Sequence, residues 1–167
     1  MSSPKLKVII PAEKRAGEAR VATVPDVVGK LIRAGVSVEV ESGAGDRSQA
    51  TDEDFRKAGA TVSASVDLAT ADVVLSVNAL EPAVLSKLKK GALTISFLSP
   101  TGSLDSITAA KNAGVTAFSL ELVPRISRAQ SMDALTSQAL CAGYRAANGN
   151  LEKRCNHNFI LISRNCC

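Results

Sequence analysis

The stretch "ADVVLSVNALEPAVLSKLKKGALTISFLSP" (Ala71–Pro100) decides the fold class of this 167-residue chain. It begins with "ADVVLSVNA" and ends with "ALTISFLSP", two short, largely apolar runs that are typical of buried strands. Between them, "EPAVLSKLKKG" predicts a helix, with Pro82 at its first position and lysines near its end, where they suit the helix dipole. A buried strand, a helix and another buried strand predict a repeated βα unit.

The same alternation continues on both sides of this stretch. Further strands are predicted in "KLKVIIPAE", "VSVEVES", the weaker "TVSA" and "VTAFSLELV". Helices are predicted in "TVPDVVGKLIRAG", where Val27, Leu31 and Ile32 have helical spacing, in "TDEDFRKAGA" with Thr51 as N-cap, and in "GSLDSITAAKNAG". Because the strands are nearly continuous runs of Val, Ile and Leu, the pattern predicts a doubly wound α/β domain with a mainly parallel sheet of about five or six strands.

Composition narrows the classes of protein that this chain can belong to. Hydrophobic residues make up 46% and charged residues 22%, as expected for a globular protein with a core. The net charge is +4 with scattered Lys and Arg, so nucleic-acid binding is not expected. The apolar runs are much shorter than the roughly 20 residues of a membrane span, and "MSSPKLKVII" lacks the core of a signal peptide.

The character of the sequence changes at about Ala147–Asn148. We expect one domain over residues 1–147 and a divergent, poorly ordered tail over residues 148–167, in which only "FILIS" could form an edge strand. Three of the four cysteines crowd into this tail, which is not a disulfide framework. Their spacing with His157 also fits no usual zinc site, so no metal is expected. Cys141 is interpreted as a small buried hydrophobe.

Two short motifs each allow two interpretations. Gly43-x-Gly45 follows a predicted strand, but the third glycine of a dinucleotide fingerprint would fall at Ser48, and the next helix begins only at Thr51, so a tight turn is favoured. Glu18 and Arg20 follow the first strand, at the edge where open α/β sheets bind ligands. There the arginine either grips a carboxylate, as a ligand or as a bidentate pair that orders a loop, or is a solvated surface charge.

The polar stretch "VPRISRAQSMD" (Val123–Asp133) stands out against the apolar pattern and precedes the helical pattern "MDALTSQALCAGYRA". It places the donors and acceptors of Arg125, Gln130, Asp133 and Thr136 close together. A simpler interpretation is that Asp133 or Ser131 caps the helix. A cap, however, leaves Arg125, Arg128 and Gln130 unexplained.

"VPRISRAQSMDAL…AGYRA" resembles the NAD(H)-binding component, or alpha subunit, of the proton-translocating NAD(P) transhydrogenases. The resemblance continues through "SVNA", "ITAAKNAGVTAFSLE", "TDEDFRKAGA", "VEVESGAG" and "GEARVATVPDVVGKLIRAG", and covers roughly residues 5–147. Outside the polar stretch, these segments are shared with the related alanine dehydrogenases. Those enzymes are similar at Arg20, their substrate-carboxylate arginine, but carry a lysine in place of Asn78 and a catalytic histidine in place of Ser99. Alanine dehydrogenase activity is therefore disfavoured.

The resemblance implies a function for the polar stretch. In the family it lies beside the nicotinamide of NAD(H), from which a hydride passes directly to NADP(H) on a partner domain. By this resemblance Arg125, Gln130 and Asp133 organise the site, and Thr136 and Tyr144 also lie near the cofactor. Amide and carboxylate groups that fix the carboxamide would set the ring face that reacts. The implied partners are the NADP(H)-binding and membrane-spanning components, with a homodimer in the intact protein.

The chain departs from the family in one large respect. The family's alpha subunit continues into a second α/β domain with a glycine-rich fingerprint, whereas here "AGYRA" is followed by the divergent tail. We interpret the chain as a truncated or frame-shifted product that is inactive alone. The implied location is peripheral, on the cytoplasmic side of the membrane or in the mitochondrial matrix. An alternative is a non-catalytic interaction module that pairs with full-length partners.

Overall fold

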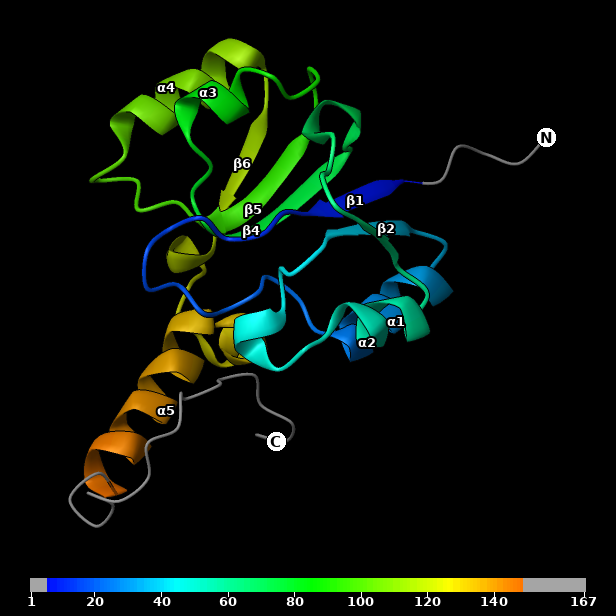
Figure 1. Cartoon of the computed structure of the whole chain (residues 1–167). Helices are drawn as coiled ribbons and strands as arrows, with labels where there is room; N and C mark the ends of the chain where they lie inside the picture. The colour runs from blue at the N-terminus through cyan, green and yellow to red at the C-terminus, as the bar shows by residue number, and fades with distance from the viewer. Residues whose placement is uncertain (1–5, 149–167) are drawn as a thin grey trace.

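A computed structural model describes residues 6–148, which contain one six-stranded sheet (Figure 1). Every neighbouring pair of strands is parallel, and the order across the sheet is β3-β2-β1-β4-β5-β6. The doubly wound parallel sheet predicted from the βα alternation is thus confirmed. The strands are β1 (Lys7–Ile10), β2 (Ser37–Glu41), β3 (Thr61–Ser63), β4 (Val73–Asn78), β5 (Leu93–Phe97) and β6 (Thr116–Ser119).

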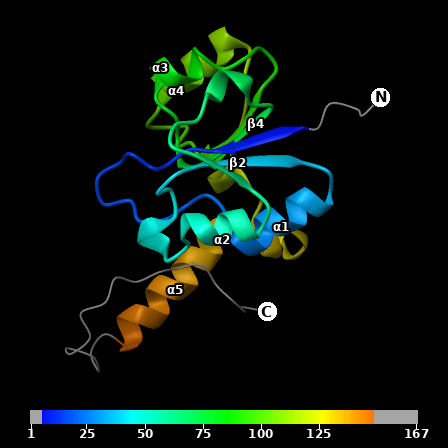
Figure 2. The same cartoon turned by 45° about the vertical axis from the view of Figure 1, so that its right-hand side comes forward.

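Helices cover both faces of the sheet, and each face has its own apolar core. One core joins α1 and α2 to β1 and β2 around Phe55, and the other lies beneath α3 and α4 around Leu85 (Figures 1 and 2). The last helix, α5, projects away from the sheet in both views. The α-helices are α1 (Pro25–Arg33), α2 (Asp52–Lys57), α3 (Pro82–Leu85), α4 (Leu104–Ala113) and α5 (Ala134–Asn148).

Local sequence signals explain where these helices begin, and two expectations need correction. Thr51 caps α2 in a complete capping box with Asp54, as its spacing predicts. In α1, however, Val28 is the buried residue and Val27 is exposed, so the apolar face is offset by one position from the predicted one. Helix α3 ends at Leu85, much earlier than "EPAVLSKLKKG" predicts, because the chain continues in i→i−3 turns.

Short 3₁₀ helices fill several connections, including part of the predicted polar loop. They are η1 (Asp46–Ser48), η2 (Leu68–Thr70), η3 (Leu120–Leu122) and η4 (Ser127–Met132). The stretch 123–133 is therefore ordered by a 3₁₀ helix, where its proline and polar residues predicted an irregular loop. Among residues 6–148, no helix is both long and apolar enough to cross a membrane.

The expectations for the tail fall outside the described residues. These include its poor order, the possible strand "FILIS", and the cysteines that accompany His157. Helix α5 extends through Asn148, one residue past the boundary proposed at residue 147. Because β1 and β4 are neighbours whose connections lead to opposite halves of the sheet, their carboxyl ends frame the crevice in which folds of this type bind ligands.

Candidate functional site

A cavity of about 550 Å³ opens at the carboxyl ends of β1, β4 and β5. Arg15 from the loop after β1, Asn78 from the end of β4 and Ser99 from the loop after β5 all line it. The Arg15 Nη1 atom donates a hydrogen bond of 3.2 Å to Asn78 Oδ1. These contacts place a polar cluster at the crevice that the sheet topology favours for ligand binding.

A bidentate ion pair between Arg20 and Glu18 lies beside this cavity. Arg20 Nε donates to Glu18 Oε1 at 2.7 Å, and Arg20 Nη2 donates to Glu18 Oε2 at 2.6 Å. These hydrogen bonds outweigh the effect of burial and lower the pKa of Glu18 to about 2. Of the interpretations open from the sequence, the structure supports a bidentate pair that orders the loop, and the guanidinium fork of Arg20 is already filled by a carboxylate of its own chain.

Asn78 connects this pair to a second carboxylate. Its Nδ2 atom donates to Glu18 Oε2 at 3.0 Å and to Glu13 Oε2 at 2.9 Å. Glu13 also accepts a hydrogen bond from the backbone N–H of Val77 at 2.5 Å. At this position the chain therefore has an amide that bridges two carboxylates, and neither Asn78 nor Ser99 can exchange protons with a keto-acid substrate near neutral pH.

Asp133 and Thr136, two of the predicted site residues, lie together at the start of α5. Asp133 is only 5% exposed, and its Oδ1 atom accepts hydrogen bonds from the backbone N–H groups of Leu135 (3.0 Å) and Thr136 (3.1 Å). The Thr136 hydroxyl donates to Asp133 Oδ2. These bonds lower the pKa of Asp133. Asp133 is thus the N-terminal cap of α5, and the capping interpretation of this residue is correct.

The other predicted site residues are placed differently. Arg125 and Gln130 are exposed, and neither side chain donates a hydrogen bond within the described part of the chain. Tyr144 is 69% exposed and lies eight residues after Thr136 along α5, about 12 Å along the helix axis. The fold therefore gathers Asp133 and Thr136, leaves Arg125 and Gln130 available for a ligand, and holds Tyr144 apart.

One contact near the site has no local sequence signal. Arg20 Nη1 donates to Gln138 Oε1 at 3.4 Å, which connects the loop after β1 to the second turn of α5. The guanidinium carbon of Arg20 also lies 5.8 Å from the centroid of the Phe97 ring, at the end of β5. The two ends of the Arg20–Gln138 contact are 118 residues apart in the chain, so spacing alone does not predict it.

The Gly43-x-Gly45 segment forms a tight turn, as the position of the next helix suggested. Asp52 Oδ1 accepts a hydrogen bond from the Gly43 N–H at 2.9 Å, which places a carboxylate where a dinucleotide fingerprint would present free amides to phosphate. Gly45 is required for packing, since a Cβ atom there would lie 2.2 Å from the Ala50 carbonyl oxygen and 2.8 Å from the Phe55 ring.

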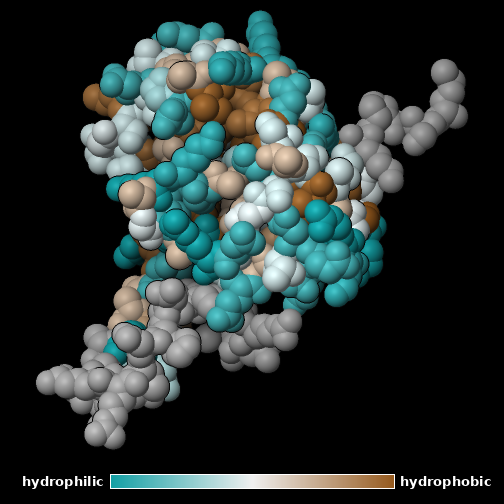
Figure 3. Space-filling model, viewed as in Figure 1, coloured by the Kyte–Doolittle hydropathy of each residue, from teal (hydrophilic) through white to brown (hydrophobic). Residues whose placement is uncertain are grey.

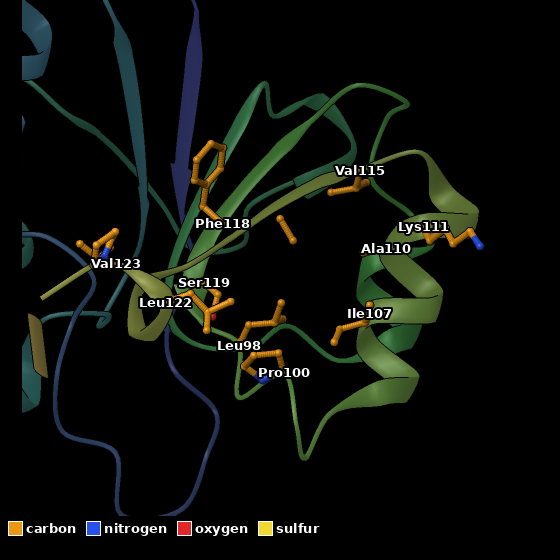
Figure 4. Close-up of a pocket in the computed structure, with 12 residues that line it drawn as sticks. Leu98, Pro100, Ile107, Ala110, Lys111, Val115, Phe118, Ser119, Leu122 and Val123 are labelled. Atoms are coloured by element: carbon orange, nitrogen blue, oxygen red, sulfur yellow. The ribbon is translucent and has the colours of Figure 1, made fainter. Parts of the chain in front are cut away.

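A larger cavity of about 720 Å³ lies between α4 and β6, and Figure 4 shows its lining. The side chains around it are mostly apolar, including Leu98, Ile107 and Val115. Figure 3 shows hydrophobic residues gathered on this upper part of the molecule. Because it has few polar groups, we place the candidate site at the smaller cavity and the stretch 123–133. In residues 6–148 there is no cluster of three or more potential metal ligands, and Cys141 is half-buried, not fully buried as expected.

Comparison with known proteins identifies the family. The family described as "Alanine dehydrogenase/PNT, N-terminal domain" matches residues 9–142. The chain belongs to this family. The resemblance found in the sequence is thereby confirmed over nearly the whole of the described region.

Within the alanine dehydrogenase/PNT family, this chain is more similar to transhydrogenases than to alanine dehydrogenases. It is 43% identical over 148 residues to the first of the polypeptides that form the NAD(P) transhydrogenase alpha subunit of Rhodospirillum rubrum, a match that covers 84% of this chain and 38% of that polypeptide. Identity to the alanine dehydrogenase of Mycobacterium tuberculosis is 35% over 120 residues, covering 71% of this chain and 32% of that enzyme. The chain thus spans less than two fifths of the length of either relative.

The fold agrees with solved structures of the same family. The crystal structure of transhydrogenase from Sinorhizobium meliloti superposes with a TM-score of 0.81 and 43% sequence identity, covering 86% of this chain and 43% of that one. The parallel sheet and its helices are thus the architecture of the N-terminal domain of this family.

Proposed function

We propose that this chain contributes the NAD(H)-side N-terminal domain of a proton-translocating NAD(P) transhydrogenase. The reaction would be direct transfer of a hydride between NAD(H) and NADP(H), coupled to proton translocation by the complete protein. The observation that carries the proposal is the stretch 123–133, which presents the exposed side chains of Arg125 and Gln130 next to the capped start of α5. Its support is the greater similarity to transhydrogenase alpha subunits.

NAD(H) would supply the hydride chemistry, and the residues of this chain fit a role in orienting its nicotinamide end. Gln130 offers an amide and Arg125 a guanidinium, both exposed, for hydrogen bonds to a carboxamide. Asp133 keeps the backbone in place by capping α5, with Thr136 bonded to it. Tyr144 would approach the cofactor from further along α5. Orientation of this kind needs no acid–base group, since a hydride passed between two nicotinamides involves no proton.

Strong binding of the dinucleotide would come from a region of the protein other than residues 6–148. In the described region the glycine turn that most resembles a phosphate cradle is filled by Asp52. The proposed arrangement therefore needs a second domain for NAD(H), an NADP(H)-binding component and a membrane-spanning component, and it includes a homodimer. The domain would then lie at the membrane surface, on the cytoplasmic side or in the mitochondrial matrix.

A second role, as an interaction module, is favoured by one observation. Several large hydrophobic side chains are exposed on β6, the stretch 120–132 and α5: Phe118, Leu122, Ile126, Met132 and Leu140. A contiguous apolar surface of this kind is typical of contact with another protein surface. The two roles are compatible, because a domain that orients one cofactor must also dock against the domains that hold it.

The proposed reaction can be tested by joining residues 1–147 to the remaining, C-terminal portion of the R. rubrum polypeptide. This chimaera, mixed with an NADP(H)-loaded partner domain, should transfer hydride from NADH to NADP⁺. With pyruvate, ammonia and NADH it should form no alanine, because neither Asn78 nor Ser99 can act as an acid–base group. Alanine formation without transhydrogenation would reverse the proposal.

A further inference from the structure

The stretch 123–133 is held at both ends by contacts that converge on the end of strand β5. We propose that Arg20 and Glu121 are positioning residues, which together fix this stretch and the first turns of α5 relative to the sheet. The inference rests on the proposed function, since it explains how the exposed donors of Arg125 and Gln130 would be kept in register with a cofactor. It assigns these two residues no contact with the cofactor itself.

Glu121 forms the first anchor, two residues before Val123. Its carboxylate accepts hydrogen bonds from the backbone N–H groups of Leu98 (3.1 Å) and Ser99 and from the Ser119 hydroxyl (2.6 Å). Burial alone would raise the pKa of Glu121, but these hydrogen bonds outweigh it and lower the pKa. Ser99 has a left-handed backbone with φ of 49°, a conformation that needs support from its surroundings, and Glu121 supplies some of that support.

Arg20 forms the second anchor, on the far side of the stretch. Glu18 and the Phe97 ring fix its guanidinium group, which uses its remaining arm to bind Gln138 at 3.4 Å. Gln138 lies five residues after the cap Asp133 and so in the second turn of α5. The arginine therefore connects α5 to the sheet through a side chain that is itself held at three points.

Both anchors end on the same three residues, since Phe97 lies under Arg20, and Leu98 and Ser99 donate to Glu121. Between the anchors, residues 124–128 are all exposed and Ala129 is the one buried residue of the 3₁₀ helix η4. A segment with so little packing of its own takes its position from its ends. Loss of either anchor should therefore loosen the stretch and leave the sheet intact.

Hydrogen exchange on the full 167-residue chain tests this inference without nucleotide or partner. In Arg20→Lys, which keeps the charge but cannot hold Glu18 and Gln138 together, amides of residues 127–140 should exchange about five- to tenfold faster, the effect of one lost hydrogen bond. Glu121→Gln should have a similar effect on residues 120–133. Amides of β1 and β4 should change less than about twofold, and so should every peptide in the control Arg56→Lys, whose exposed side chain pairs only with Glu53 at 3.8 Å.

Two further readouts separate positioning from a general loss of stability. If Arg20 acts through Gln138, then Arg20→Lys should add no further acceleration in α5 when Gln138→Ala is already present. The single tyrosine of the chain, Tyr144, should report the loosened helix as a larger amplitude of local motion in time-resolved fluorescence anisotropy. Unchanged exchange over 120–140 in both single variants would overturn the inference, and so would equal acceleration in β1 and β4. Because no hydride transfer is measured, either result leaves the proposed function standing.

Discussion

Replacement of Glu18 by glutamine removes a carboxylate that holds a neighbouring arginine at two points. The pKa of Glu18 is lowered from 4.5 to about 2, mainly by the hydrogen bonds from Arg20, and its side chain is 8% exposed. A shift of this size corresponds to about 3 kcal/mol, which solvent screening of the more exposed Arg20 reduces to about 1–2 kcal/mol. We therefore expect Glu18→Gln to lower the free energy of unfolding by about 1–2 kcal/mol at pH 7.

The same change should disappear in acid, because the pKa of Glu18 in the folded protein lies below its ordinary value. The stabilisation is then fully present above about pH 4.5 and is lost as the pH falls towards 2, so that at pH 3 less than about half should remain. Urea unfolding followed by far-ultraviolet circular dichroism measures it, since the chain has no tryptophan. The control Glu53→Gln, from an exposed pair, should stay within about 0.5 kcal/mol of the wild type. Equal effects of the two substitutions at pH 7, or a difference that persists at pH 3, would refute the reasoning.

Three other predictions concern binding, packing and the exposed donors. In calorimetric titration, the 167-residue chain should bind NADH at millimolar strength or weaker, on the order of 4 kcal/mol, and micromolar binding would contradict the absence of a phosphate cradle from residues 6–148. Gly45→Ala should lower the free energy of unfolding by about 2 kcal/mol in urea titrations, because its Cβ would overlap the Ala50 carbonyl oxygen, whereas Gly143→Ala, in an open helical position, should raise it by up to about 1 kcal/mol. Gln130→Ala should leave the thermal unfolding curve nearly unchanged, within about 0.5 kcal/mol, and a larger loss would mean that Gln130 has a structural role.

The order of strands and helices was predictable because each signal is local. The valine and leucine runs around β4 and β5, the capping box at Thr51 and the proline at the start of α3 depend only on near neighbours in the sequence. Errors occurred where two local patterns are nearly equivalent. Val27 and Val28 both have apolar spacing with Leu31 and Ile32, and packing against the sheet selects Val28.

The candidate site was only partly predictable. The polar stretch stood out because its residues break the apolar pattern, and Asp133 proved to be both a predicted site residue and the cap of α5. The Arg20–Gln138 contact and the Glu121 hydrogen bonds connect segments that are 118 and more than 20 residues apart. Such contacts depend on the tertiary fold, in which parallel strands bring their carboxyl ends together at one edge.

Single-turnover hydride transfer tests the central claim most directly. The chimaera of residues 1–147 with the C-terminal portion of the R. rubrum polypeptide would be loaded with NADH and mixed with an NADP⁺-loaded partner domain, with and without Gln130→Ala. Because Gln130 is proposed to orient the ring and not to supply affinity, the rate constant for transfer should fall by at least about tenfold while the Kd for NADH changes less than about threefold. No transfer by the unsubstituted chimaera, or equal losses in rate and affinity, would contradict the account.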